Sequence, residues 1–136
     1  MEKENTRNPF EDCEVISSYS RMDALNDGVL VDISTLAKEA GFVYPVAVTR
    51  AVYDGILNPS PELERQGQSF TGRAWDMLTI LRVAIRTTRE PGDQVRFAPL
   101  FIREEGGNPE PVALRSVCGP GDGAEPVITI MLPTED

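Results

Sequence analysis

The sequence predicts an α+β fold in which one long helix packs against a C-terminal antiparallel sheet of three to four strands, after short N-terminal helices. Over residues 73–88, apolar side chains recur at three- and four-residue spacing, the pattern of one helical face. In the last third of the chain, β-rich segments alternate with turns rich in glycine and proline. Because 136 residues is the size of one domain, we expect a single domain over residues 15–136.

The N-terminal end is predicted to be a flexible acidic arm followed by a short helix. Residues 1–14 carry five carboxylates against one lysine and one arginine, with few apolar side chains to anchor them. Ser20 stands three residues before Asp23, the spacing of a capping box with aspartate in place of glutamate. This spacing predicts a helix from Ser20 to about Asn26.

Four further elements are expected before the long helix. Ser34 and Thr49 are placed to cap helices, and Pro45 favours extended backbone around it. The alternative for the fourth element is a longer strand that runs through Val52. A loop is predicted over residues 58–72, which contain two prolines and two glycines. The four elements are a strand, a helix, a strand and a helix, over residues 29–33, 35–40, 44–48 and 50–57.

The C-terminal sheet is predicted as a meander. Pro99 suits an edge strand, whereas the apolar run over 127–132 suits a strand inside the sheet, with the long helix on one face. The glycine-rich run over 118–123 lacks the lysine of a P-loop, so we interpret it as a hairpin connection. The three strands are expected near residues 94–103, 112–118 and 127–132.

Histidine is absent from the chain, which removes the usual proton shuttle at neutral pH and the commonest metal ligand. Ser-His-Asp and Cys-His catalysis are therefore unavailable, although carboxylate, lysine or tyrosine chemistry stays open. Cys13 and Cys118 lack the spacing of a metal site, while a single bridge between them stays open. We expect no metal and no cofactor, and the sequence favours a protein without enzymatic activity.

A net charge of −9 favours a basic protein partner and makes nucleic acid an unfavourable one. Residues 1–8 have no apolar run behind their charges, so we do not expect them to be a secretory signal, and no apolar run approaches the roughly 20 residues that cross a bilayer. We therefore expect a cytoplasmic protein without membrane contact. The oligomeric state stays open.

The long predicted helix carries the most specific candidate site. Its flank beside the apolar stripe presents Trp75, Arg82, Arg86 and Arg89. Guanidinium groups bind carboxylates and phosphates, and an indole adds cation–π attraction, so this flank is a candidate anion- or partner-binding site. In the alternative interpretation these arginines pair with the protein's own carboxylates while Trp75 covers the core. Arginines of the predicted meander are candidates to extend either arrangement: Arg96, Arg103 and Arg115.

Several segments resemble a family of small bacterial proteins with a domain of unknown function. These are YSRMDALNDGVLVD over residues 19–32, YPVAVTRAV over 44–52, VCGPGD over 117–122 and EPVITIMLP over 125–133. Members of that family are often associated with plasmids, phages and other mobile elements. The resemblance implies this context and assigns no functional residue.

Charge, missing catalytic motifs and this resemblance together favour a non-enzymatic acidic accessory protein that binds a basic protein partner. An inhibitor or nucleic-acid mimic of a mobile element is a special case of that hypothesis. The alternative is a small anion- or nucleotide-binding domain, with an enzyme left open, that uses the arginine-lined flank of the helix.

Overall fold

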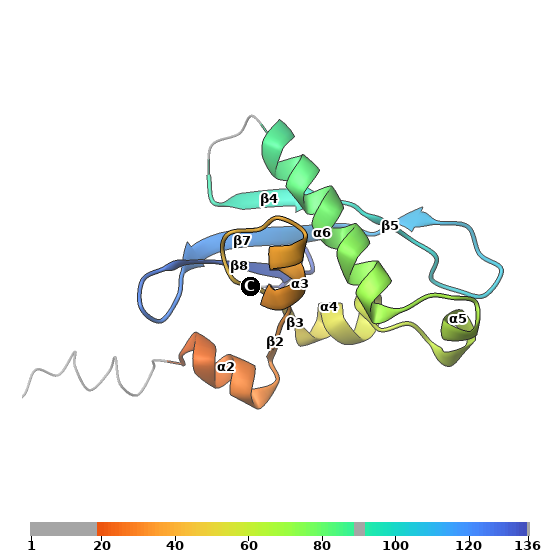
Figure 1. The fold of residues 1–136 in the computed structure, drawn as a ribbon, viewed down its shortest axis with the longest axis horizontal. Helices are drawn as coiled ribbons and strands as arrows, with labels where there is room; N and C mark the ends of the chain where they lie inside the picture. The colour runs from red at the N-terminus through yellow and green to blue at the C-terminus, as the bar shows by residue number, and fades with distance from the viewer. Residues whose placement is uncertain (1–18, 89–91, 136) are drawn as a thin grey trace, which may run out of the picture.

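A five-stranded mixed sheet forms one layer of the α+β fold, and helices cover one of its faces (Figure 1). The computed structural model describes residues 19–88 and 92–135. The predicted acidic arm over residues 1–14 lies outside the described residues. Across the sheet the strands follow the order β2 (Leu30–Asp32), β3 (Val46–Thr49), β8 (Pro126–Met131), β7 (Leu114–Pro120) and β4 (Gln94–Phe97).

Short helices precede the one long helix, as predicted. None of the helices within the described ranges is long and apolar enough to cross a bilayer. The helices are α2 (Arg21–Asp27), α3 (Ser34–Glu39), α4 (Arg50–Val52), the π-helical turn η1 (Tyr53–Leu57), α5 (Pro61–Arg65) and α6 (Phe70–Thr87).

Side-chain caps set the start of most of these helices. The capping box of Ser20 and Asp23 is present at α2, and the Thr49 hydroxyl accepts the amide of Val52 at 3.3 Å. A helix therefore follows Thr49, and the alternative strand through Val52 is wrong. The predicted cap at Ser34 is also wrong, because its hydroxyl bonds Asp32 instead and α3 begins after Ile33.

The segment predicted as a loop over residues 58–72 is partly helical. Ser60 accepts the amide of Leu63 and starts α5, and Leu63 is buried. Ser69 accepts the amide of Gly72, so α6 begins at Phe70, three residues earlier than predicted. Hydroxyl caps thus begin helices within a stretch whose prolines and glycines indicated a loop.

The apolar stripe of α6 forms the centre of the core, as its periodicity predicts. Ala74, Met77, Leu78 and Leu81 have no exposed surface. They belong to one cluster with sheet side chains from β3, β7 and β8, namely Val48, Leu114 and Ile130. The long helix therefore packs on one face of the sheet (Figure 1).

The sheet itself differs from the predicted antiparallel sheet of three to four strands. Antiparallel neighbours β4, β7 and β8 form the expected meander, and β8 lies inside the sheet. However, β3 pairs with β8 in parallel, with Val46 opposite Ile128, and β2 adds a fifth strand. Val46, Ala47 and Val48 are all buried, so their sequence shows no alternation that would identify the partner strand.

The strand predicted over residues 94–103 is interrupted at Pro99. After β4, the chain continues into β5 (Leu100–Phe101), which pairs with β6 (Glu110–Pro111) in a separate two-stranded sheet. Proline has no amide hydrogen to donate to the ladder, which explains the break. The carbonyl of Pro99 still accepts the amide of Val112 at 2.9 Å.

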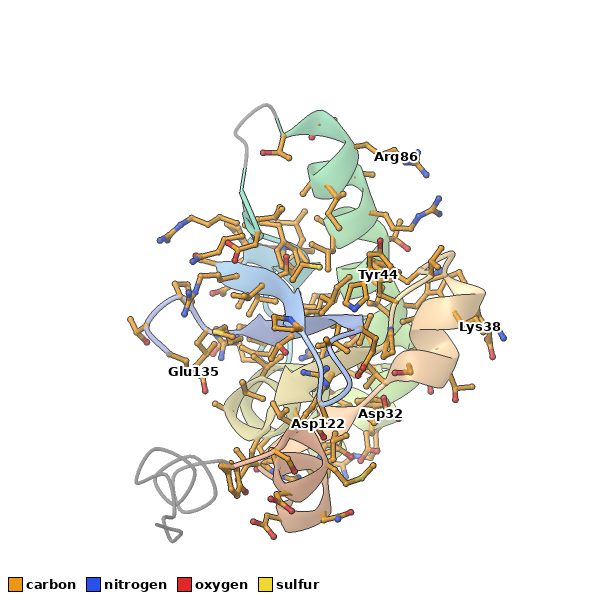
Figure 2. All side chains as sticks on the ribbon, turned by 90° about the vertical axis from the view of Figure 1, so that its left-hand side faces the viewer. Asp32, Lys38, Tyr44, Arg86, Asp122 and Glu135 are labelled. Carbon is orange, nitrogen blue, oxygen red and sulfur yellow. The ribbon has the colours of Figure 1, made fainter. Side chains whose placement is uncertain are left out.

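Helix α2 is held against the β7–β8 turn by polar contacts (Figure 2). The Asp122 carboxylate accepts the amides of Arg21 and Met22 at 2.8 and 2.9 Å. The Arg21 guanidinium donates to the Thr129 hydroxyl at 2.7 Å and to the Ile128 carbonyl at 3.0 Å. The amides of Met22 and Arg21 hold the pKa of Asp122 below its ordinary value of 3.8.

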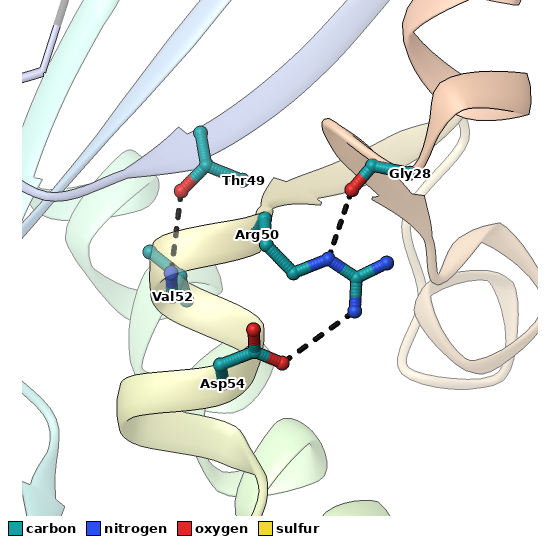
Figure 3. A network of polar contacts seen from close by, with 5 residues as sticks. All are labelled: Gly28, Thr49, Arg50, Val52 and Asp54. Carbon is teal, nitrogen blue, oxygen red and sulfur yellow. Dashed lines mark hydrogen bonds and ion pairs between the residues drawn. The ribbon is translucent and has the colours of Figure 1, made fainter.

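A second network joins the end of α2 to the start of α4 (Figure 3). Arg50 Nε donates to the Gly28 carbonyl at 2.9 Å, and Arg50 Nη1 pairs with Asp54 at 3.5 Å. Gly28 has a φ of +78°, and a Cβ there would lie 2.9 Å from Arg50 Nη2. Glycine is therefore required at this position.

Arg73 is the buried arginine of α6, and it connects three segments. Its side chain is only 4% exposed, and Nη1 donates to the Ile56 carbonyl at 2.6 Å. Its Nη2 donates to the Ile102 carbonyl, and the guanidinium lies over the Phe101 ring. Burial lowers the pKa of Arg73. Backbone carbonyls, rather than a carboxylate, therefore stabilise this charge.

Replacing Asp122 by alanine removes both acceptors at the start of α2, so we expect a lower free energy of unfolding at neutral pH. Because folding lowers the pKa of Asp122, its contribution is complete above pH 3.8 and is lost as the pH falls through the folded pKa. Urea unfolding measured from neutral pH into acid should show that the free energies of unfolding of the unchanged protein and of Asp122→Ala converge. Asp122→Asn keeps one acceptor and should lose less stability, and a difference that is constant at every pH contradicts the prediction.

Replacing Arg73 by alanine leaves the carbonyls of Ile56 and Ile102 without their donor. We expect the free energy of unfolding to fall by roughly 3 kcal/mol, since each buried group that loses its partner costs 1–3 kcal/mol. Arg65→Ala, at an exposed position of α5, is the control and should stay within about 0.5 kcal/mol. Equal urea midpoints for the two variants would show that the hydrogen bonds of Arg73 do not stabilise the fold.

Candidate functional site

The structure places three of the four predicted site residues along one side of α6. Trp75 is 41% exposed, Arg86 is exposed and Arg82 is half-buried. Arg89 lies outside the described residues. Within residues 19–88 and 92–135, no carboxylate pairs with Arg82 or Arg86. The flank therefore lies at the surface of α6, beside the buried stripe.

Arg82 has a structural role that the sequence did not reveal. Its Nη1 donates to the carbonyl of Ala40, the C-cap residue of α3, at 3.1 Å. The guanidinium lies against Gly41, where a Cβ would be 2.9 Å from Arg82 Cζ. Gly41 also has a φ of +101°, which favours glycine. Arg82 thus ends α3 and positions the segment that follows it.

The segment between α3 and β3, residues 41–45, is fixed at both ends. The amide of Phe42 donates to the Ala37 carbonyl at 2.9 Å, and the Phe42 ring is buried. At the other end, the Pro45 carbonyl accepts the amide of Ile128 at 2.9 Å. Between these anchors Val43 is 90% exposed and Tyr44 is 44% exposed. Two large apolar side chains therefore project from a turn that is anchored at both ends.

This segment and α6 enclose a depression of about 350 Å³, which we call the basic groove. Arg82, Ile85 and Arg86 form its α6 wall, and Ile85 is itself 41% exposed. Its other lining residues are Gly41, Phe42, Val43, Tyr44 and Ile128. Guanidinium groups and exposed apolar surface thus meet in one place.

The basic groove is positive although the protein is strongly negative. Two arginines line it, and Lys38 of α3, next in sequence to the exposed Glu39, lines a neighbouring depression. Figure 2 shows Arg86, Tyr44 and Lys38 on one side of the molecule, whereas Asp32 and Asp122 lie toward α2. Two cations thus line the groove, and no acidic side chain among the described residues does.

The arginines of the sheet do not extend the site. Arg96 and Arg115 stand opposite each other in the β4–β7 ladder, on the face turned away from α6. Arg115 donates to Gln94 Oε1 and to the Glu135 carbonyl. Arg103 points to the Gly55 carbonyl, at 3.5 Å. The hypothesis that the α6 flank continues into the meander is therefore wrong for Arg96 and Arg115, whereas Arg103 lies near η1.

Sequence reasoning missed the contribution of residues 41–45. A signal was present, because three large apolar residues stand between Gly41 and Pro45, where the chain leaves a helix and enters a strand. Nothing in that run shows that it will lie beside α6. Of the glycine-rich run predicted as a hairpin connection, residues 121–123 do lie between β7 and β8, and Asp122 caps α2, whereas residues 118–120 form the end of β7.

The chemistry of the basic groove suits binding rather than proton transfer. It presents two guanidinium groups, a phenol and aliphatic surface, and none of the carboxylates that the structure describes lines it. In the part of the chain that the structure describes, no three His, Cys, Asp or Glu side chains come together as a metal site. Guanidinium groups favour carboxylates or phosphates, and the aliphatic surface favours apolar groups.

The two groove arginines, Arg82 and Arg86, should contribute differently to the free energy of unfolding. Arg82→Ala removes the donor to the Ala40 carbonyl, so we expect the free energy of unfolding to fall by about 1 kcal/mol. Arg86→Ala removes an exposed side chain and should change it by less than about 0.5 kcal/mol. Thermal unfolding of both variants checks the prediction, and a larger loss for Arg86→Ala contradicts the roles assigned to them.

Comparison with known proteins gives a family but no function. No curated protein and no solved structure matches the chain. The model of DUF6573, described as a family of unknown function, matches residues 6–136. That match covers nearly the whole sequence, so the chain belongs to the family of unknown function DUF6573.

Proposed function

We propose that this is a non-enzymatic cytoplasmic accessory protein that binds a protein partner through the basic groove and the adjoining flank of α6. The observation that carries the proposal is the exposure of Val43, which is 90% accessible beside Tyr44 and two arginines. The anchored turn keeps the Val43 side chain in water, so the folded protein lacks the free energy that burial of this side chain would contribute. Contact with a partner recovers it.

The residue types at this surface are those that dominate protein interfaces. Tryptophan, tyrosine and arginine are enriched among the side chains that contribute most to binding. Here Trp75 and Tyr44 are both more than two-fifths exposed, and Arg86 lies on the same side of α6 as Trp75. The fixed ends of residues 41–45 reduce the ordering cost of association.

The net charge of the protein and the local charge of the groove each indicate a property of the partner. The net charge of −9 favours a partner that is basic overall, because total charge controls long-range attraction. Within the groove the local charge is positive, so the segment of the partner that enters it is acidic. The resemblance to small bacterial proteins of mobile elements supports an accessory role, and the absence of histidine supports a role without catalysis.

A second candidate is the binding of a small anion or nucleotide in the same groove. Its volume of about 350 Å³ lies within the range of small-molecule sites, and Arg86 and Tyr44 would supply charge and stacking. The exposure of Val43 favours a polypeptide instead, since a small ligand inside the groove covers only part of a side chain that is 90% exposed.

The proposal is tested with a photo-reactive phenylalanine derivative in place of Tyr44, cross-linked in the native cell. The captured protein is then purified and its Kd measured with Val43→Asp. We expect the Kd to rise at least about tenfold, equivalent to 1.4 kcal/mol, because a charge replaces the buried apolar contact.

Leu100→Asp is the matched control, because Leu100 is 58% exposed on β5 and lies outside the groove. It should leave the Kd unchanged. Equal effects of Val43→Asp and Leu100→Asp overturn the proposal. A rise in Tm with nucleotides or inorganic phosphate that Arg86→Ala abolishes, together with no cross-linked protein, replaces it with the second candidate.

A further inference from the structure

A second depression adjoins the basic groove on the other side of residues 42–44. It has a volume of about 450 Å³ and lies between this turn and α3. Phe42, Val43 and Tyr44 line both depressions. The lining residues found only in the second are Ser34, Lys38 and Pro45. The two depressions therefore form one continuous surface with the exposed Val43–Tyr44 turn between them.

Each depression contains a cation that the fold leaves accessible. Arg86 lies in the groove against α6, and Lys38 lies in the last turn of α3, where both side chains are exposed. Arg82 differs, because its guanidinium is used by the Ala40 carbonyl. Figure 2 shows Arg86 and Lys38 apart on the same side of the molecule, with Tyr44 in the region between them.

We infer that the partner supplies an extended segment with two acidic side chains that flank an apolar one. This inference rests on the proposed function and specifies its ligand. One acidic side chain pairs with the planar guanidinium of Arg86, the other with the ammonium of Lys38, and the apolar residue covers Val43 and Tyr44. A guanidinium binds a carboxylate through two parallel hydrogen bonds, whereas an ammonium acts as a point charge.

The geometry makes this recognition depend on the distance between the two charges. Hydrogen bonds fix residues 41–45 to α3 and to β8, and Arg82 fixes the end of α3 to α6. Lys38 and Arg86 are consequently held on elements that do not slide past each other. A segment with only one acid, or with its acids adjacent, reaches one cation and leaves the other solvated.

The test uses synthetic peptides in which two glutamates flank a leucine at increasing separations, with binding to the full chain measured by fluorescence anisotropy. One separation should bind best, and each glutamate-to-glutamine change should weaken that peptide about threefold, the effect of an exposed ion pair. Lys38→Ala should not change the binding of the peptide that lacks the glutamate paired with Lys38. Arg86→Ala should not change the binding of the peptide that lacks the glutamate paired with Arg86. Arg65→Ala, on α5, is the control for loss of general charge.

Failure of this inference is distinguishable from failure of the proposed function. Equal binding at all separations, or equal losses from Lys38→Ala with every peptide, overturns two-point recognition. If the partner captured at position 44 still loses affinity with Val43→Asp, the docking surface stands while the two-acid segment is rejected. Weaker binding in high salt should accompany a positive result, because exposed charges are screened.

Discussion

The parallel pairing of β3 with β8 is the contact on which the rest of the structure depends. It joins Val46 to Ile128 and Val48 to Ile130, and so connects the two halves of the chain inside one sheet. The same register brings the Pro45 carbonyl to the Ile128 amide and thereby sets residues 41–45 beside α6. Because these residues form one wall of the basic groove, the groove exists only when this strand pair is in place.

Arginine serves mainly as a structural cross-link in this acidic protein. Arg21, Arg73 and Arg82 each donate to at least one backbone carbonyl of a distant segment. A guanidinium can satisfy several carbonyls at once, which offsets the cost of removing both the charge and the carbonyls from water. Arg86 makes no such contact within the described ranges, and in this it differs from these structural arginines.

The candidate binding surface is a composite of a helix, a turn and a second helix, each held by the core rather than by the surface itself. Phe42 and Leu81 belong to the same buried cluster, while their neighbours Val43 and Arg82 reach the groove. Side chains on supported elements lose little conformational freedom on association. Such a surface suits recognition of a defined segment better than adaptable, non-specific contact.

The sequence by itself determined α6, the helix caps at Ser20 and Thr49, the antiparallel β4–β7–β8 order and the placing of Trp75, Arg82 and Arg86 on one flank. These features follow from hydrogen bonds and apolar spacing between residues close in the chain. Tertiary structure alone decided the parallel β3–β8 pair, the inward turn of Arg73 and the joining of residues 41–45 to α6. Each of these is a contact between segments that are distant in the chain. The packing free energy that stabilises such a contact leaves no local pattern in the sequence.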